Sequence, residues 1–218
     1  MTIKYNNVFI EDAYTICGNY ENDGPLSKYF DKKYEKDLYF GEKSWEQAEV
    51  HLLKEANTNI LKKNKLKEED IDLLISGDLQ NQIAASNYMA REFNIPFLGI
   101  FEACSTSGEG LAIGSTYIEG GFAKRILVST SSHNMAAEKQ FRNPTEYGTP
   151  KPKTATFTST GGVSILLSNK KSKVKVESST IGKVVDMGTT DVNHMGAVMA
   201  PAAVSYTHLR AHETSQDL

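Results

Sequence analysis

The chain has 218 residues, with 24 Lys and Arg against 27 Asp and Glu, a formal net charge of -3 and a pI of about 6.0. This length suits one large domain or two small ones. The charge leaves no broad cationic field that could condense onto phosphates, so the composition argues against nucleic acid as a partner.

Neither a membrane span nor a secretion signal is expected. No apolar run reaches the ~18 residues that a membrane span needs, and the first residues lack the cationic start and apolar stretch of a signal peptide. The chain has 2 cysteines, Cys17 and Cys104, which cannot build a disulfide framework or a zinc cluster. We therefore expect a reducing, cytosolic compartment, no metal and no cofactor.

The first predicted elements are an amphipathic helix and a buried strand. Ser44 followed by Gln47 forms a capping box that starts the helix. The strand at residues 71–76, IDLLIS, is apolar almost throughout, as is typical of a strand buried on both faces. The apolar face of the helix, which we expect to cover this strand, consists of Trp45, Ala48, Leu52, Leu53, Ala56 and Ile60.

Helices and strands then alternate, which predicts βαβ units and a largely parallel sheet. A helix from Leu79 to Phe93 is stopped by Asn94 and Pro96. The elements that follow are a strand at 97–101, a helix at 105–119 closed by two glycines, and a strand at 125–130.

Beyond residue 132 the pattern changes. A proline-rich stretch, FRNPTEYGTPKPK, predicts a long covering or functional loop. Gly161 and Gly162 between apolar runs at 154–160 and 163–168 predict a two-residue hairpin, so the sheet gains antiparallel strands. The lysines that follow are expected to protect a sheet edge and bind no partner: Lys170, Lys171, Lys173 and Lys175.

The last fifteen residues, 204–218, show neither helical nor strand periodicity. Their SYTHLRAHET stretch resembles the translation of a sequencing adapter, and we predict a non-native tail that has no functional role. The domain proper is expected at residues 1–203.

Cys104 is the strongest candidate for chemistry. A buried strand leads into it and a helix begins directly after it, and a helix N-terminus lowers the pKa of a thiol. The competing interpretation is a small buried hydrophobic residue. Gly108, Gly110 and Gly114 lie within the following helix, and each costs ~1 kcal/mol there unless another backbone packs closely, so this helix is expected in tight quarters. The same glycines give only a weak signal for a nicotinamide-binding fold, because they fall inside the helix instead of the turn.

Seven ordered sequence blocks run from the N-terminal region to residue 203: DGPL, KSWEQAE, DIDLLISGDLQNQ, ACSTSGEGLA, GGFAKRILVSTSSHN, EKQFRNPTEYG and GAVMAPAA. With these blocks the chain resembles the thiolase superfamily, and within it the stage V sporulation protein AD family. The resemblance implies an α/β fold with αβαβα layers, of which this chain holds the N-terminal half only.

The resemblance also implies a function. It implies a sporulation protein that binds dipicolinic acid, free or as its calcium chelate, and takes part in its uptake into the developing spore. It implies binding without turnover. In active condensing enzymes the cysteine works with a His and a second His or Asn from the second half of the fold, and no positions of this chain match these partners. It further implies other stage V sporulation membrane proteins as partners, a homodimer when full length, and a peripheral location on the cytoplasmic side of the spore inner membrane.

Candidate ligand contacts follow from residue chemistry. Arg142 is our choice for a carboxylate of the ligand, since a guanidinium matches a carboxylate bidentately; Arg91 and Arg125 are expected at the surface. His133 ends a strand and either faces the pocket or is a neutral histidine satisfied by backbone. Asp78 either orients a pocket group or caps the helix that begins at Leu79.

The alternative function is an active condensing acyltransferase, similar to 3-oxoacyl synthase III. In that case Cys104 accepts an acyl group from a coenzyme A or carrier-protein thioester.

Overall fold

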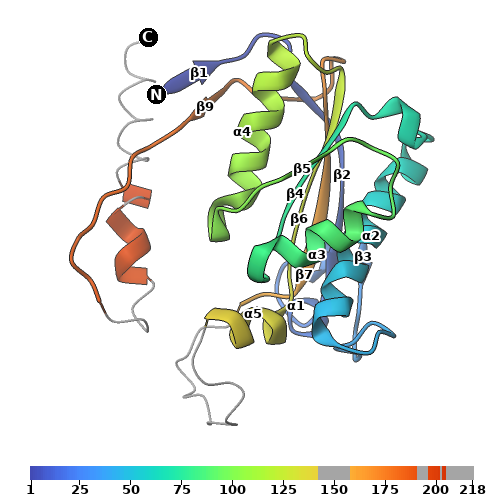
Figure 1. The fold of residues 1–218 in the computed structure, drawn as a ribbon, viewed down its shortest axis with the longest axis vertical. Coiled ribbons are helices and arrows are strands. Elements are labelled where there is room, and N and C mark those ends of the chain that lie inside the picture. The colour runs from blue at the N-terminus through green and yellow to red at the C-terminus, as the bar shows by residue number, and fades with distance from the viewer. Residues whose placement is uncertain (142–157, 191–195, 202, 205–218) are drawn as a thin grey trace. The chain divides into compact units, whose positions relative to one another are not determined.

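The computed structural model of the chain describes residues 1–141, 158–190, 196–201 and 203–204. The chain forms two compact units. One takes in residues 2–151 and 156–180 and carries the central sheet and the labelled helices of Figure 1. The other consists of Met1, 152–155 and 181–218; its described part has helical residues at 196–201 and 203–204.

A mixed, twisted sheet forms the centre of the larger unit, with the strand order β3-β2-β7-β6-β4-β5 and β8 beside β2. β4 is parallel to β5 and β6, whereas β7 lies antiparallel to both β2 and β6. The strands are β2 (Phe9–Cys17), β3 (Lys32–Lys33), β4 (Leu73–Gly77), β5 (Phe97–Gly99), β6 (Arg125–Ser132), β7 (Gly161–Ser168) and β8 (Val174–Lys175). Separately, β1 (Thr2–Lys4) pairs with β9 (Ser178–Thr180).

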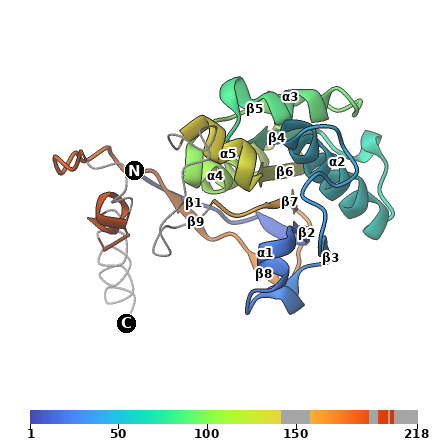
Figure 2. The same cartoon turned by 90° about the horizontal axis from the view of Figure 1, so that it is seen from below.

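Helices cover both faces of this sheet, with α4 on one side and α2 and α3 on the other (Figures 1 and 2). The helices are α1 (Asn19–Asn22), α2 (Trp45–Lys63), α3 (Ala84–Ala90), α4 (Thr106–Glu119) and α5 (Asn134–Phe141). Short 3-10 turns lie at η1 (Ser27–Tyr29), η2 (Glu68–Asp70), η3 (Asn81–Ile83) and η4 (Ala103–Ser105).

The alternation of side chains along the central strands builds two apolar layers. Leu74 and Leu127 point toward α2 and α3, where they pack with Leu53. Their neighbours Ile75 and Val128 point to the opposite layer, which holds Ile118 of α4. Because both faces are covered, the strands have the continuous apolar character from which the buried strand was predicted.

The predicted α2 and the parallel β4, β5 and β6 are confirmed. Ser44 caps α2, since its hydroxyl accepts a hydrogen bond from the Gln47 amide at 3.2 Å. The Gln47 side chain in turn accepts a hydrogen bond from the backbone amide of Lys43 at 3.3 Å. The predicted helix after Cys104 is confirmed as α4.

The predicted hairpin at Gly161 and Gly162 is wrong. Both glycines are the first residues of β7, residues 158–160 form no strand, and neither glycine has a positive φ. They are needed for close packing instead. A Cβ on Gly161 would lie 2.9 Å from the Ile16 carbonyl oxygen, and one on Gly162 would lie 3.2 Å from Leu52 of α2. The prediction of antiparallel strands in this part of the chain is nevertheless confirmed by β7.

Two further differences concern α3 and β2. The helix predicted from Leu79 to Phe93 is shorter, because Gln82 and Ile83 adopt the left-handed conformation and α3 begins only at Ala84. The long strand β2 was not predicted at all. It lies between β3 and β7 and widens the sheet beyond the βαβ units.

Candidate functional site

Cys104 lies in the 3-10 turn that leads directly into α4, and its side chain is exposed. Ala103 before it has a φ of +44°, the left-handed region that non-glycine residues seldom adopt. The Thr106 hydroxyl holds this turn in place, since it donates to the Ala103 carbonyl at 2.8 Å and accepts from the Glu102 amide at 3.1 Å. The sulfur therefore stands at the N-terminal end of a helix, on a turn of defined and strained shape.

The ends of β4 and β6 support this turn. A Cβ on Gly77, the last residue of β4, would lie 2.3 Å from the Ile100 carbonyl oxygen and 2.5 Å from Thr106 Cγ2, so only glycine fits there. The hydroxyls of Ser107 and Thr130 lie 3.2 Å apart and are hydrogen bonded. The first turn of α4 is thus tied to the carboxyl ends of two neighbouring parallel strands.

Two of the three helix glycines serve the close packing that was predicted. A Cβ on Gly110 would lie 2.6 Å from Val128 Cγ1, and a Cβ on Gly114 would lie 2.9 Å from Leu167 Cδ1. Gly108 is different, because a Cβ added there would meet nothing within 4 Å. Close packing that requires glycine is therefore found on the sheet-facing side of α4.

Asp78 follows β4 and is buried. One carboxylate oxygen accepts a hydrogen bond from the Gln80 amide at 2.8 Å, and the other accepts from the Ser86 amide at 2.7 Å. Ser86 is in the first turn of α3, so Asp78 makes a capping contact, but to a helix that begins five residues later than Leu79.

His133 follows β6 and is fully buried. Its Nε2 lies 2.8 Å from the Leu38 carbonyl oxygen, its Nδ1 lies 3.5 Å from the Ala136 amide, and its ring meets Phe40 edge-on. Burial lowers the pKa of His133 below its usual value. A neutral ring with its proton on Nε2 satisfies both contacts, because Nε2 donates to the carbonyl and Nδ1 accepts from the amide.

The remaining predicted contact, Arg142, lies outside the described residues. Asp78, His133 and Cys104 all follow strands at the same edge of the sheet, but both Asp78 and His133 use their polar atoms inside the protein. Within the described ranges no group of three or more His, Cys, Asp or Glu residues could hold a metal ion.

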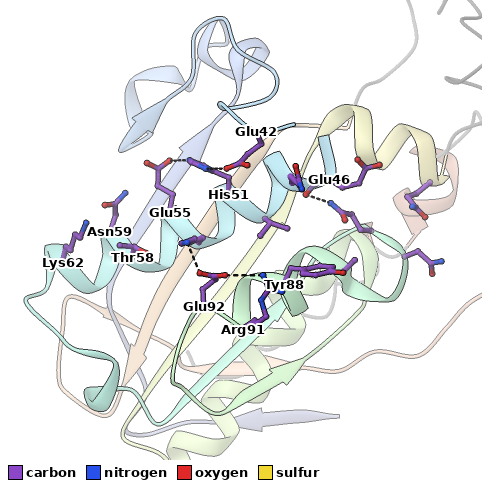
Figure 3. A pocket seen from close by; sticks show the side chains of 17 residues that line it. Glu42, Glu46, His51, Glu55, Thr58, Asn59, Lys62, Tyr88, Arg91 and Glu92 are labelled. Carbon is purple, nitrogen blue, oxygen red and sulfur yellow. Dashed lines mark hydrogen bonds and ion pairs between the residues drawn. The ribbon is translucent and has the colours of Figure 1, made fainter. Parts of the chain in front are cut away.

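A groove of about 990 Å³ lies on the other side of the sheet from α4, over α2 and α3. Its walls carry charges of both signs (Figure 3), with Lys54 Nζ 3.1 Å from Glu92 and His51 Nδ1 3.0 Å from Glu42. None of the residues Cys104, Asp78 and His133 lines this groove. It was not predicted from the sequence, because its lining combines residues of α2 with residues of separate segments around α3 and of α5.

Glu49, a fully buried carboxyl on α2, was not predicted from the sequence either. Its Oε1 accepts a hydrogen bond from the Ser131 hydroxyl and its Oε2 accepts one from the Gln80 side-chain amide, both at 2.9 Å. Burial, and then the nearby charge of Asp78, raise the pKa of Glu49 to about 8. A signal was present, since position 49 is one turn from both Trp45 and Leu53 on the apolar face of the helix.

Solved structures similar to the chain show its fold. An OleA variant from Xanthomonas campestris matches 76% of this chain and 57% of its own, with a TM-score of 0.51 and 14% identity. A 3-oxoacyl-(acyl carrier protein) synthase III from Xanthomonas oryzae pv. oryzae matches 76% of this chain and 57% of its own, with a TM-score of 0.50 and 14% identity. The chain therefore has the predicted thiolase-like α/β fold.

Sequence comparison is more specific. Stage V sporulation protein AD of Bacillus subtilis (strain 168) is 50% identical over 196 residues, which cover 90% of this chain and 58% of that relative. This chain thus spans little more than half of the length of the relative. The family model of stage V sporulation protein AD matches residues 1–218. By both matches, the chain belongs to the stage V sporulation protein AD family.

Proposed function

We propose that the chain forms part of a sporulation protein that binds dipicolinic acid and takes part in its uptake into the developing spore. The 50% identity to stage V sporulation protein AD carries this proposal, because it places the chain in a sporulation family with a thiolase-like fold. The ligand is bound at the sheet edge near Cys104 and is not chemically changed.

The described part of the chain supplies no catalytic histidine to Cys104. A condensing enzyme needs a side chain that polarises a thioester carbonyl beside its cysteine. Of the two histidines that the structure describes, His133 is engaged with a backbone carbonyl and His51 lines the groove over α2 and α3. In this part of the chain, neither histidine is available to polarise a thioester carbonyl beside Cys104.

Ligand chemistry supports Arg142 as the contact for a dicarboxylate. A guanidinium binds a carboxylate through two parallel hydrogen bonds, and the N-terminus of α4 favours an anion. The two described arginines already have carboxylate partners: Arg91 lies 3.5 Å from Glu92, and Arg125 Nε donates to Glu11 at 2.9 Å. This leaves Arg142 for the ligand within residues 1–203.

Location and partners belong to the same proposal. The protein acts as a peripheral protein on the cytoplasmic side of the spore inner membrane, works with other stage V sporulation membrane proteins, and forms a homodimer when full length. Across the described ranges, no helix combines the length and the apolar character that crossing a bilayer requires. Docking onto partners embedded in the membrane needs no such helix.

Calorimetry with dipicolinate tests the proposal. We expect binding by the 218-residue chain, and a loss of affinity of about tenfold or more in Arg142→Ala, since a hydrogen bond to a charged group contributes ~1.5–3 kcal/mol. Arg91→Ala is the matched control and should bind as the wild type does. A titration with calcium present separates the free acid from its chelate. Equal affinity in Arg142→Ala would remove Arg142 from the site, and no heat in any titration would contradict the binding function.

The second candidate is an active condensing acyltransferase, favoured by the exposed Cys104 at the start of α4 in a thiolase-like fold. Incubation of the full-length protein with acetyl-coenzyme A, followed by peptide mass analysis, tests it. Acyl transfer to sulfur would add an acetyl group to Cys104 and release coenzyme A, and Cys104→Ser would lose this adduct. An unmodified Cys104 supports the binding protein, and the buried Cys17 provides the internal reference peptide.

A further inference from the structure

Two buried carboxyls lie close together beneath the turn that follows β4. Glu49 of α2 is 0% exposed and Asp78 is 1% exposed. Gln80 bridges them, because its backbone amide donates to Asp78 and its side-chain amide donates to Glu49. Ser131 of β6 holds the other oxygen of Glu49. A single helix carboxyl therefore connects the segment after β4 with the end of β6.

The segment between Asp78 and α3 is strained. Gln82 and Ile83 are consecutive residues with φ values of +57° and +49°, a conformation that is costly for a β-branched side chain. The side chain of Ile83 packs over Gly99 of β5. A Cβ added to Gly99 would lie 2.4 Å from Ile83 Cδ1. Such strain persists only where the surrounding contacts maintain it, and here those contacts include the hydrogen bonds of Asp78 to Gln80 and Ser86.

Besides Glu49, α2 carries six titratable groups. His51, Lys54, Glu55 and Lys62 line the groove, and Lys63 is paired with Asp12 at 2.9 Å. Glu46 is paired with Lys139 of α5 at 3.0 Å, and α5 also carries the buried Glu138. His133 directly follows β6, and burial lowers its pKa. The group that acts most on the Glu49 carboxyl by its charge is Asp78.

We propose that the buried Glu49 carries a proton beside Asp78, and that loss of this proton to solvent loosens the turn at residues 78–86. Both oxygens of Asp78 already accept hydrogen bonds from backbone amides. Glu49 keeps the proton, and its contact with Ser131 survives because a hydroxyl can accept as well as donate. A second buried negative charge would repel the first and cost desolvation energy, and the strained turn is the part least able to resist.

Loss of the same proton also affects the structure around Cys104. Gly77 precedes Asp78 and packs against Thr106, while Thr130 precedes Ser131 and is hydrogen bonded to Ser107. The two strands that support the first turn of α4, β4 and β6, thus end beside Asp78 and Glu49. Glu49 is in this sense a positioning residue, and the shape of the turn that carries Cys104 becomes sensitive to pH.

Hydrogen exchange of the 218-residue chain across a pH series tests the proposal. After correction for intrinsic exchange rates, we expect protection at residues 79–86 and 103–108 to fall as pH rises toward the pKa of Glu49, by at most about tenfold per pH unit for one linked proton. In Glu49→Gln protection should stay constant, because the amide imitates the protonated acid in both of its hydrogen bonds. Glu46→Gln, one turn away and outside the buried pair, should behave as the wild type does.

Asp78→Asn gives an independent arm that does not depend on how Glu49→Gln folds. Removal of the neighbouring charge lowers the pKa of Glu49, so the loss of protection should begin at a lower pH. Wild-type protection that does not change with pH would overturn the proposal. So would a full pH response in Glu49→Gln, or an unchanged midpoint in Asp78→Asn.

Discussion

At the level of single residues, the polar side chains at the carboxyl edge of the sheet differ in what they have left to offer a ligand. Cys104 is exposed at the start of α4, whereas Asp78 and His133 are buried and bound to backbone groups. Asp78 and His133 therefore shape the edge from inside. Of the predicted contacts in the described ranges, Cys104 is the one whose side chain faces solvent.

His133 should make the protein less stable in acid. Burial depresses its pKa, so below about pH 6.5 the unfolded chain takes up a proton that the folded chain resists. Its contribution is fully present above that pH and is lost as pH falls through the folded pKa. Urea unfolding near pH 7 and near pH 5 should show a smaller acid loss in His133→Gln than in the wild type, by at most about 1.4 kcal/mol per pH unit. Equal acid losses in the two proteins would contradict this.

At the level of elements, α4 combines a sheet-facing side on which glycine is required with another side on which it is not. Gly110 and Gly114 bring the helix axis close to β6 and β7, where Val128 and Leu167 leave no space for a Cβ. Gly108 has open space around it. The sequence alone does not distinguish these glycines, whereas the packing shows which of them are required.

Alanine substitutions at these glycines should change the free energy of unfolding in opposite directions. Gly108→Ala should stabilise the protein by about 0.5–1 kcal/mol, because alanine restricts the unfolded chain and favours the helix. Gly110→Ala should destabilise it by about 1–3 kcal/mol through overpacking against Val128. Urea unfolding of the two variants side by side measures both effects, and a shift in the same direction for both would refute the packing argument.

At the level of the whole molecule, the chain matches 58% of the length of its Bacillus subtilis relative, and it forms two compact units. The sheet, the groove and the Cys104 turn all belong to the unit of residues 2–151 and 156–180. Residues 204–218 belong to the other unit, and we predicted from their sequence that they have no functional role.

Removal of residues 204–218 should therefore leave the main unfolding transition and the proposed dipicolinate binding unchanged. The physical reason is that the apolar layers of the sheet are built from residues before position 181. Thermal unfolding and calorimetry of the shortened chain measure the two properties. A lower midpoint or a weaker affinity would show that the segment belongs to the working protein.

Local patterns in the sequence were sufficient for α2, for the β4, β5 and β6 strands and for the start of a helix after Cys104. The capping contact of Ser44, the continuous apolar strands and the helix-terminal cysteine depend on residues a few positions apart. The position of Cys104 at a helix start could be predicted for the same reason, whereas the thiolase-like fold was predicted from the resemblance of whole sequence blocks.

What those elements bury together became known only from the folded chain. The Nε2 of His133 meets a carbonyl 95 residues away, and Glu49 meets the Ser131 hydroxyl across a separation of 82 residues. The glycines of β7 are required by Ile16 and Leu52, far earlier in the chain, and not by a hairpin. Periodicity and caps report on neighbours along the chain, whereas burial, pKa values and close packing depend on segments that only folding brings into contact.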